Sequence, residues 1–368
     1  MNVGALAALR RRRQVFYAGP IDPPASWARK ASSKAMRLAG GRGKFHFFSA
    51  SRLRAVAAAV AERDAPGAKL DFFHGFTPWT ATRPTRPYVA WSDCTFREYV
   101  RIFHDVTKFQ ADDIARIERA EARWLKGARR VLFTSDWAAG EAIRGYGLDS
   151  SRTRSVGIFG EIEAPEADSY AGAARFVFMS TNFAAKGGPV ATEAVRHLRR
   201  THPNAELIVV GSLPRSPIAQ DGIEYVGFLS KEVAEDVRRL RTMVASSAAI
   251  VLPTSSDICP LSLVEAAAFG CPAIASRAFA IPEIIGNGGG ILLDNPTDPK
   301  EVAAAMGWML DNPGAHADMR REAWRAARER HSRAAFEARL LAEVDEALAE
   351  PSPDTREGPV SAVRFARR

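Results

Sequence analysis

The sequence lacks an apolar run long enough to cross a membrane, since no stretch approaches the roughly 20 consecutive apolar residues that a spanning helix needs. Near the start, the apolar segment ALAAL is too short for a signal peptide, and it comes before the arginines at 10–13 rather than after them. We therefore expect a cytoplasmic protein, with peripheral contact to the inner face of the membrane as the one membrane association left open.

Cysteine is scarce, and the three cysteines, Cys94, Cys259 and Cys271, have neither CxxC nor metal-ligand spacing. We expect free thiols and no bound metal.

The glycine fingerprint GxGxxG is also missing. The segment AGPIDPPAS follows the first expected strand instead, which argues against an NAD-dependent dehydrogenase.

Acids are nearly absent from the first 54 residues, where twelve Lys and Arg residues stand against one acid, Asp22. The whole chain has a net charge of +9. The basic segment favours contact of residues 1–54 with an anionic membrane, or an anionic acceptor, although a solubilising surface with a frayed end would look the same. Nucleic acid is not expected as a partner, because neither zinc-finger spacing nor an aromatic RNP-like motif accompanies the charge.

Short β-like runs alternate with helical patterns over most of the 368 residues. In the first half these runs lie at 14–18, 44–48, 69–75, 87–91 and 129–135. In the second half they lie at 175–180, 205–211, 223–228, 248–253 and 272–276, with helical patterns at 188–201, 231–242 and 260–269. Strand followed by helix, repeated, predicts an α/β protein with parallel sheets covered by helices on both faces.

The alternation pauses at 160–174, where GEIEAPEADSYAGAA is rich in acids and small residues and suits a linker between domains. We therefore predict an N-terminal Rossmann-like domain over 1–165 and a C-terminal one over 166–350, with the final helices packing near the N-terminal domain. The tail 351–368 has no periodicity and is predicted to be disordered.

Two acids eight positions apart, Asp257 and Glu265, stand in the segment TSSDICPLSLVEAAAFGCPAIAS. The preceding run AAIVLP reads as a buried parallel strand, and ligands bind beyond the carboxyl ends of such strands. The next helix would offer the backbone N–H groups of Leu261 and Ser262 to an anion. Acids on either side of an anion site suit a nucleotide diphosphate-sugar, which has hydroxyl groups at both ends. An ordinary loop acid and a solvent-facing helix acid would show the same spacing.

Lys186 follows the first strand of the second series, in the segment STNFAAKGG. A cation in a glycine-containing loop between strand and helix can neutralise a diphosphate, although a solvated lysine is equally compatible with this segment alone. Base recognition would come from loop backbone near Gly227 and Phe228, after the run IEYVGF.

These segments resemble the GT-B glycosyltransferase family 4, also called glycosyl transferases group 1. The family signature is a Glu-x7-Glu motif followed by a segment like VEAAAFGCPAIAS, and AIPEIIGNGGGILLDNPTDPKEVAAAM is similar to its continuation. The similarity covers roughly 129–330, is weaker over 69–128 and is poor over 1–68. It implies a GT-B fold, with two Rossmann-like domains whose parallel sheets face a central cleft.

The resemblance also implies a retaining transfer of a sugar from a nucleotide-diphosphate donor to a glycan, lipid-linked or small-molecule acceptor, without an obligatory metal or other cofactor. The C-terminal domain would bind the donor and the N-terminal domain the acceptor. In this chain Glu265 would hold the ribose, Asp257 would contact the donor sugar, and Lys186 would meet the diphosphate with help from the amides of Leu261 and Ser262.

Three departures from the family pattern bear on activity. Thr181 stands where an arginine often precedes the lysine in R-x4-K, so one cation is missing unless Arg277 or another arginine replaces it. Asp257 is one methylene shorter than the glutamate of the family. A histidine expected at the end of an N-terminal strand is replaced by Ser92 and Asp93, so Asp93 is the catalytic candidate there, and His74 is an acceptor-side candidate.

Two further hypotheses stay open at this stage. A catalytically impaired GT-B protein could bind sugar nucleotide or glycan as an accessory module, because Asp257 and Thr181 depart from the pattern. A nucleotide-sugar epimerase shares the two-domain design, but it should lack the segment LSLVEAAAFGCPAIAS.

Overall fold

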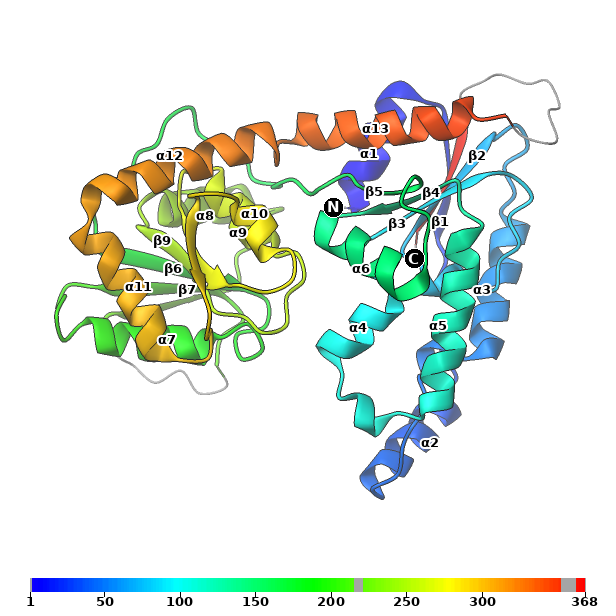
Figure 1. The fold of residues 1–368 in the computed structure, drawn as a ribbon, viewed down its shortest axis with the longest axis horizontal. Coiled ribbons are helices and arrows are strands. Elements are labelled where there is room, and N and C mark those ends of the chain that lie inside the picture. Colours follow the sequence, from blue (N-terminus) through cyan, green and yellow to red (C-terminus); the bar gives the residue numbers. More distant parts are fainter. Residues whose placement is uncertain (1, 215–220, 352–361, 368) are drawn as a thin grey trace. The chain divides into compact units, whose positions relative to one another are not determined.

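The computed structural model describes residues 2–214, 221–351 and 362–367. The chain divides into two compact units, which are described separately (Figure 1). Unit 1 comprises Met1–Gly157 and Glu337–Arg368, and unit 2 comprises Ile158–Phe336. The boundaries predicted at 165 and 350 therefore differ from the observed division, because the chain returns to unit 1 after residue 336. In the described part of the chain, no helix combines the length and apolarity needed to span a bilayer.

Unit 1 contains a six-stranded sheet in which all pairings are parallel, with the strand order β1-β12-β2-β3-β4-β5. The strands are β1 (Val15–Pro20), β2 (Leu70–His74), β3 (Tyr88–Ser92), β4 (Arg130–Phe133), β5 (Thr153–Ser155) and β12 (Val363–Arg367). The helices are α1 (Asn2–Arg12), α2 (Trp27–Leu38), α3 (Ala50–Glu62), α4 (Phe96–Phe103), α5 (Ala111–Lys126) and α6 (Asp136–Tyr146).

Strand β12 corrects the prediction of a disordered tail over 351–368. It lies inside the sheet between β1 and β2, and Phe365 is fully buried with its ring stacked on Phe72. Arg364 is also buried, and its guanidinium donates to both carboxylate oxygens of Asp71 at 2.8 and 2.7 Å. The remainder of that prediction, residues 352–361 and 368, lies outside the described residues.

The predicted strand at 44–48 is also wrong, because this segment forms a single bridge at Gly43 and a 3-10 turn at His46–Phe48. Two of its three phenylalanines, Phe45 and Phe48, are nevertheless buried. Phe45 stacks on Phe109 at a centroid distance of 4.0 Å and meets Phe96 edge-on at 5.2 Å. A β-like aromatic pattern here reflects a loop that fills a small core rather than a strand.

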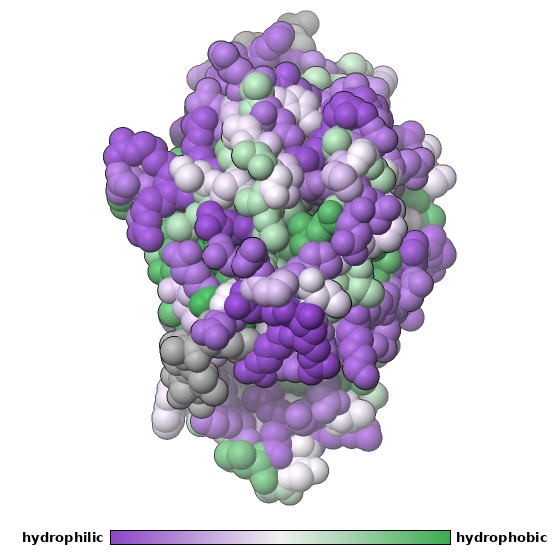
Figure 2. All heavy atoms as spheres, turned by 90° about the vertical axis from the view of Figure 1, so that its left-hand side faces the viewer, coloured by the Kyte–Doolittle hydropathy of each residue, from purple (hydrophilic) through white to green (hydrophobic). Residues whose placement is uncertain are grey.

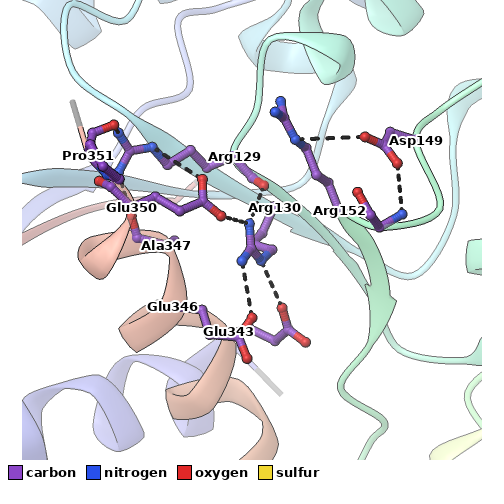
Figure 3. Close-up of polar contacts among 10 residues, drawn as sticks. Arg129, Arg130, Asp149, Arg152, Glu343, Glu346, Ala347, Glu350 and Pro351 are labelled. Carbon is purple, nitrogen blue, oxygen red and sulfur yellow. Dashed lines mark hydrogen bonds and ion pairs between the residues drawn. The ribbon is translucent and has the colours of Figure 1, made fainter. Parts of the chain in front are cut away.

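Helix α13 (Arg333–Ala349) attaches the end of the chain to unit 1 (Figure 3). Arg130, at the start of β4, makes ion pairs with Glu343 at 3.2 Å, Glu346 at 3.1 Å and Glu350 at 2.5 Å. The adjacent Arg129 donates to the carbonyl oxygens of the last turn of the helix and of the residues after it. These contacts hold the second half of α13 against β4.

Unit 2 contains a second parallel sheet with the strand order β11-β10-β9-β6-β7-β8. Its strands are β6 (Arg175–Ser180), β7 (Glu206–Gly211), β8 (Ile223–Gly227), β9 (Ala249–Leu252), β10 (Ala273–Ser276) and β11 (Gly290–Leu293). Its helices are α7 (Gly188–Leu198), α8 (Ala234–Ala245), α9 (Leu261–Ala267), α10 (Ile281–Ile285), α11 (Pro299–Asp311) and α12 (Pro313–Glu329).

The two sheets confirm the predicted fold class of two Rossmann-like α/β domains. In unit 2, α7 and α11 cover one face of the sheet, and α9 and α12 lie on the other (Figure 1). The outer face shown in Figure 2 is mostly hydrophilic, which suits solvent-facing helices rich in intrahelical ion pairs such as α12. The predicted linker at 160–174 has no regular structure, and Asp168 within it pairs with the buried Arg320 at 2.6 Å.

Candidate functional site

Strands β6 and β9 are neighbours at the point where the direction of the strand order reverses in unit 2. From β6 the chain proceeds to β7 on one side, and from β9 it proceeds to β10 on the other. Such a switch point leaves an opening at the carboxyl ends of the two strands, where ligands bind in open α/β sheets. The loop after β6 carries Lys186, and the loop after β9 carries Asp257. The fold therefore brings these two predicted residues together.

Lys186 and Asp257 form an ion pair, with Nζ 2.9 Å from Oδ2. Both side chains are partly exposed, at 18% and 23%. Lys186 also donates to the carbonyl oxygen of Ser256, and the Ser256 hydroxyl donates to the carbonyl oxygen of Ala185 at 3.0 Å. These hydrogen bonds tie the two loops to each other and keep one cation and one anion at the surface of the switch point.

Glycine is required at position 187 for this loop to approach β9. Gly187 has φ of +84°, and a Cβ atom there would lie 2.1 Å from the carbonyl oxygen of Pro253. A side chain would therefore push the lysine loop away from the end of β9. The Lys-Gly-Gly segment, which is nonspecific as a sequence pattern, is thus explained by close packing of two backbones.

Glu265 lies on α9 and is 4% exposed. Its Oε1 accepts a hydrogen bond from Lys231 Nζ at 2.5 Å and another from the backbone N–H of Glu161 at 3.3 Å. Gly160 packs directly on it, since a Cβ atom there would lie 3.2 Å from Glu265 Cγ. A buried carboxylate needs such partners, because an unpaired charge away from water is strongly unfavourable.

The other predicted donor residues lie on α9, in the lysine loop and in the loop after β8. Leu261 and Ser262 form the first turn of α9, between the two acids, although at seven residues this helix is shorter than predicted. Gly227 ends β8 with φ of +87°, and the next residue, Phe228, is 71% exposed. Thr181 begins the lysine loop, and its carbonyl oxygen accepts from the Ser212 hydroxyl.

Lys231 is the functional candidate that sequence reasoning missed. It follows Phe228 by three residues and pairs with Glu265 at 2.5 Å and with Glu161 at 3.7 Å. The signal available in the sequence was a cation just before α8, in a loop already singled out for base recognition. The suggested substitute for the missing family arginine, Arg277, is instead paired with Asp294 at 2.7 Å.

Unit 1 has its own cavity, of about 1120 Å³, at the carboxyl ends of β2 and β3. His74 ends β2, and Asp93 follows β3, so both N-terminal candidates line this cavity. The remaining wall is rich in aromatic rings and carries a few charged groups. The lining includes Arg37, Phe45, His46, Phe47, Phe48, Phe76, Phe96, Tyr99, Phe103, His104, Lys108 and Phe109.

His74 is held as a neutral imidazole at ordinary pH. Burial lowers its pKa to about 4, and the positive charge of Arg367 acts in the same direction. The ring meets Trp91 edge-on at a centroid distance of 5.1 Å. Asp93 is exposed and accepts a hydrogen bond from the Ser92 hydroxyl at 3.3 Å. At the ends of β2 and β3 the cavity thus offers a neutral imidazole, His74, and an exposed carboxylate, Asp93, to a ligand.

Behind the cavity lies a buried carboxyl group, Glu121, that the sequence did not reveal. Thr77 Oγ1 donates to its Oε1 at 2.6 Å, and Phe96 N and Tyr146 Oη donate to its Oε2 at 2.6 and 2.9 Å. Thr77 and Phe96 both line the cavity. Glu121 therefore joins the two loops that follow β2 and β3.

The cysteines are free thiols, as predicted. Cys94 lines the cavity, but it is buried, and burial raises the pKa of its thiol, so it is a poor nucleophile. Within the described ranges, no group of three or more His, Cys, Asp or Glu side chains is placed to hold a metal ion.

Comparison with known proteins shows which family the region around the unit 2 site resembles. Residues 161–330 match the family described as "Glycosyl transferases group 1". A curated relative, the MMP alpha-(1->4)-mannosyltransferase of Mycolicibacterium hassiacum, is 34% identical over 134 residues. That alignment covers 35% of this chain and 32% of the relative, so it spans about a third of the length of the mannosyltransferase.

Several solved structures share the fold at low sequence identity. The α,α-trehalose 6-phosphate synthase of Burkholderia multivorans superposes with a TM-score of 0.65 at 13% identity, covering 94% of each chain. The sucrose-phosphate synthase of Thermosynechococcus elongatus gives 0.63 at 16% identity, covering 81% of this chain and 78% of its own. HepE of Anabaena, solved with UDP and glucose, gives 0.56 at 15% identity, covering 88% and 84%. These likenesses confirm the predicted GT-B fold.

Proposed function

We propose that this protein is a glycosyltransferase that moves a sugar from a nucleotide-diphosphate donor to an acceptor, with retention of anomeric configuration. The observation that carries the proposal is the Lys186–Asp257 ion pair at the switch point of unit 2, inside the region that matches the group 1 family. No metal or other cofactor is required in this proposal, because Lys186 supplies the positive charge for the diphosphate.

The donor occupies the loops of unit 2. Glu265 accepts hydrogen bonds from the ribose hydroxyls, and its ion pair with Lys231 holds the carboxylate in place. Phe228, with its exposed ring, and the backbone at Gly227 contact the base. When the bond between the sugar and the diphosphate breaks, negative charge grows on the departing phosphate, and the Lys186 ammonium and the amides of Leu261 and Ser262 stabilise it.

The acceptor occupies the cavity of unit 1. Asp93 accepts a hydrogen bond from the acceptor hydroxyl that attacks the sugar, and the neutral His74 orients it. The aromatic wall suits a sugar ring or another partly apolar acceptor, because such surfaces pack against aromatic faces. Contact with an anionic membrane is also part of the proposal, in the narrower form argued in the next subsection.

The experiment is a mutant series assayed for transfer and for hydrolysis of UDP-, GDP- and ADP-sugars. Glu265→Ala should weaken donor binding about 10- to 100-fold, the loss expected for a charged hydrogen bond, with a smaller effect on kcat. Asp257→Ala should lower kcat about 100-fold or more with little change in binding. Asp257→Glu restores the acid of the family and should keep activity. Asp294→Ala, at an exposed acid of the same unit, is the control.

Wild-type rates in both Glu265→Ala and Asp257→Ala would refute the site. Donor binding with no turnover of any nucleotide sugar would instead favour an accessory module that binds sugar nucleotide.

A further inference from the structure

Helix α2 packs on unit 1 through its polar side. Ser33 is buried, its hydroxyl donates to the carbonyl oxygen of Lys44 at 2.8 Å, and the N–H of Lys44 donates back at 3.0 Å. Gly43 lies against the same side chain, since a Cβ atom there would come within 2.4 Å of Ser33 Oγ. Arg37, one turn further along, is half-buried with its guanidinium 5.3 Å from the Phe109 ring centroid.

The opposite side of α2 is apolar and faces solvent. Trp27 and Leu38 are each 80% exposed. They are eleven residues apart, which is close to three full turns, so they lie on one line along the helix. Ala28 and Ala35 are exposed in the same arc. A surface helix of a globular protein ordinarily shows the reverse, with its apolar stripe inward.

Lysines border this apolar arc. Lys30 and Lys34 are exposed on its edge, and Arg42 is exposed just after the helix. Other cations of the basic segment are already used within the unit: Arg11 pairs with Glu337, Arg13 with Asp345, and Arg52 is buried against Asp22. Arg10, Arg12 and Arg54 are exposed elsewhere in the segment, but on α2 the exposed lysines stand beside Trp27 and Leu38, the most exposed large apolar side chains among the described residues.

We propose that α2 is an interfacial helix that binds the surface of an anionic membrane, with Trp27 and Leu38 inserted among the lipids and Lys30 and Lys34 on the headgroups. An apolar arc bordered by cations matches an anionic bilayer in both polarity and charge. Figure 2 shows this combination at its lower end, where α2 lies in Figure 1, with hydrophobic and hydrophilic residues exposed side by side.

The consequence for the reaction rests on the proposed function. Arg37 of α2 lines the unit 1 cavity, and the partly exposed Tyr99 and Phe103 line it too. When α2 is bound to the membrane, the cavity that Arg37 lines lies close to the lipid headgroups. The acceptor class that fits is therefore a hydroxyl-bearing group carried on a lipid.

Flotation of the full chain with lipid vesicles tests the proposal. The wild-type protein should float with vesicles of equal parts phosphatidylglycerol and phosphatidylcholine at low salt, and not with phosphatidylcholine alone. Lys30→Glu/Lys34→Glu should lower the partition coefficient about 30-fold or more, because each lysine near an anionic surface contributes roughly 1 kcal/mol. Trp27→Ser/Leu38→Ser should lower it at least 10-fold. Trp27→Phe, which keeps the apolar surface, should retain binding.

Two matched controls carry equivalent changes on unit 2. Arg238→Glu/Arg239→Glu makes the same change in net charge on α8, and Trp308→Ser removes another exposed tryptophan. Both should float like the wild type. Equal flotation of the α2 variants and these controls, or no flotation of the wild type, would overturn the proposal.

A change in oligomeric state of Trp27→Ser/Leu38→Ser by light scattering, without an effect on flotation, would assign the arc to a second copy of the chain and also overturn it. Hydrolysis of UDP-, GDP- and ADP-sugars is measured on the same variants without vesicles. Flotation with no hydrolysis would contradict the proposed function and leave the membrane proposal intact. Hydrolysis with no flotation would contradict the membrane proposal and leave the proposed function intact.

Discussion

Glu121, the buried carboxyl group behind the unit 1 cavity, makes the stability of the fold depend on pH. Burial raises its pKa to about 7, and the hydrogen bonds from Thr77, Phe96 and Tyr146 act against that shift without cancelling it. The folded protein therefore holds this proton more tightly than the unfolded chain does. The resulting contribution to stability is fully present below about pH 4.5 and is lost as the pH rises through 7.

We predict that Glu121→Gln removes this pH dependence. The amide can keep all three contacts, because its oxygen accepts from Phe96 and Tyr146 while its nitrogen donates to the Thr77 hydroxyl. The free energy of unfolding of the variant, relative to that of the wild type, should rise by about 3 kcal/mol between pH 5 and pH 8. Urea denaturation of both proteins at the two pH values measures the difference. Parallel pH profiles would contradict the shift.

Among the elements, β12 determines how the end of the chain enters the sheet of unit 1. It brings the end of the chain between β1 and β2, and its Arg364 meets Asp71, 293 positions earlier in the sequence. The ion pair is nearly closed to water, with side-chain exposures of 7% and 1%. A buried pair of this kind stabilises little in itself, but removing one partner leaves a buried charge that is poorly compensated; for Asp71 the remaining cation is Arg86, at the longer distance of 3.7 Å.

Arg364→Ala should therefore lower the free energy of unfolding by about 3–5 kcal/mol. The double variant Asp71→Leu/Arg364→Met, which removes both charges, should recover most of that loss. Arg175→Ala is the matched control, because Arg175 is also a strand arginine paired with an acid but is 38% exposed, and it should cost less than about 1 kcal/mol. Denaturation with urea ranks the three variants, and equal losses for Arg364→Ala and Arg175→Ala would contradict the importance assigned to the buried Arg364–Asp71 pair.

At the scale of the whole molecule, the two units have separate sheets, cores and candidate sites. A ligand that binds only the folded state stabilises it by about 2.7 kcal/mol at a hundred times its dissociation constant. For a nucleotide this stabilisation should appear first in the unit that contacts it.

We expect UDP, GDP or ADP, whichever matches the donor, to slow amide hydrogen exchange in segments 181–188, 227–232 and 254–265 of unit 2. The reduction should reach about 100-fold at saturation. Exchange in β2 of unit 1 serves as the internal control. Protection of β2 to the same extent, or of none of the three segments, would contradict the assignment of the donor site.

The repeated strand and helix patterns, the buried run that ends at Pro253 and the acids at 257 and 265 were readable without coordinates. They are local properties: apolar periodicity follows burial, and a loop after a parallel strand always emerges at the same edge of the sheet. For this reason the fold class, and the position of the Lys186 and Asp257 loops at the same edge of the second sheet, could be predicted from the sequence.

Long-range pairing decided the rest. The strand at 363–367 contains an arginine, Arg364, whose guanidinium is satisfied by the distant Asp71 and by the carbonyl oxygens of Val60 and Arg63. Lys231 became significant through its contacts with Glu265 and Glu161. The apolar face of α2 points outward because the opposite face, which carries Ser33, is held against Lys44. Periodicity gives a helix its two faces, but burial is a property of the neighbours, and those neighbours come together only when the chain has folded.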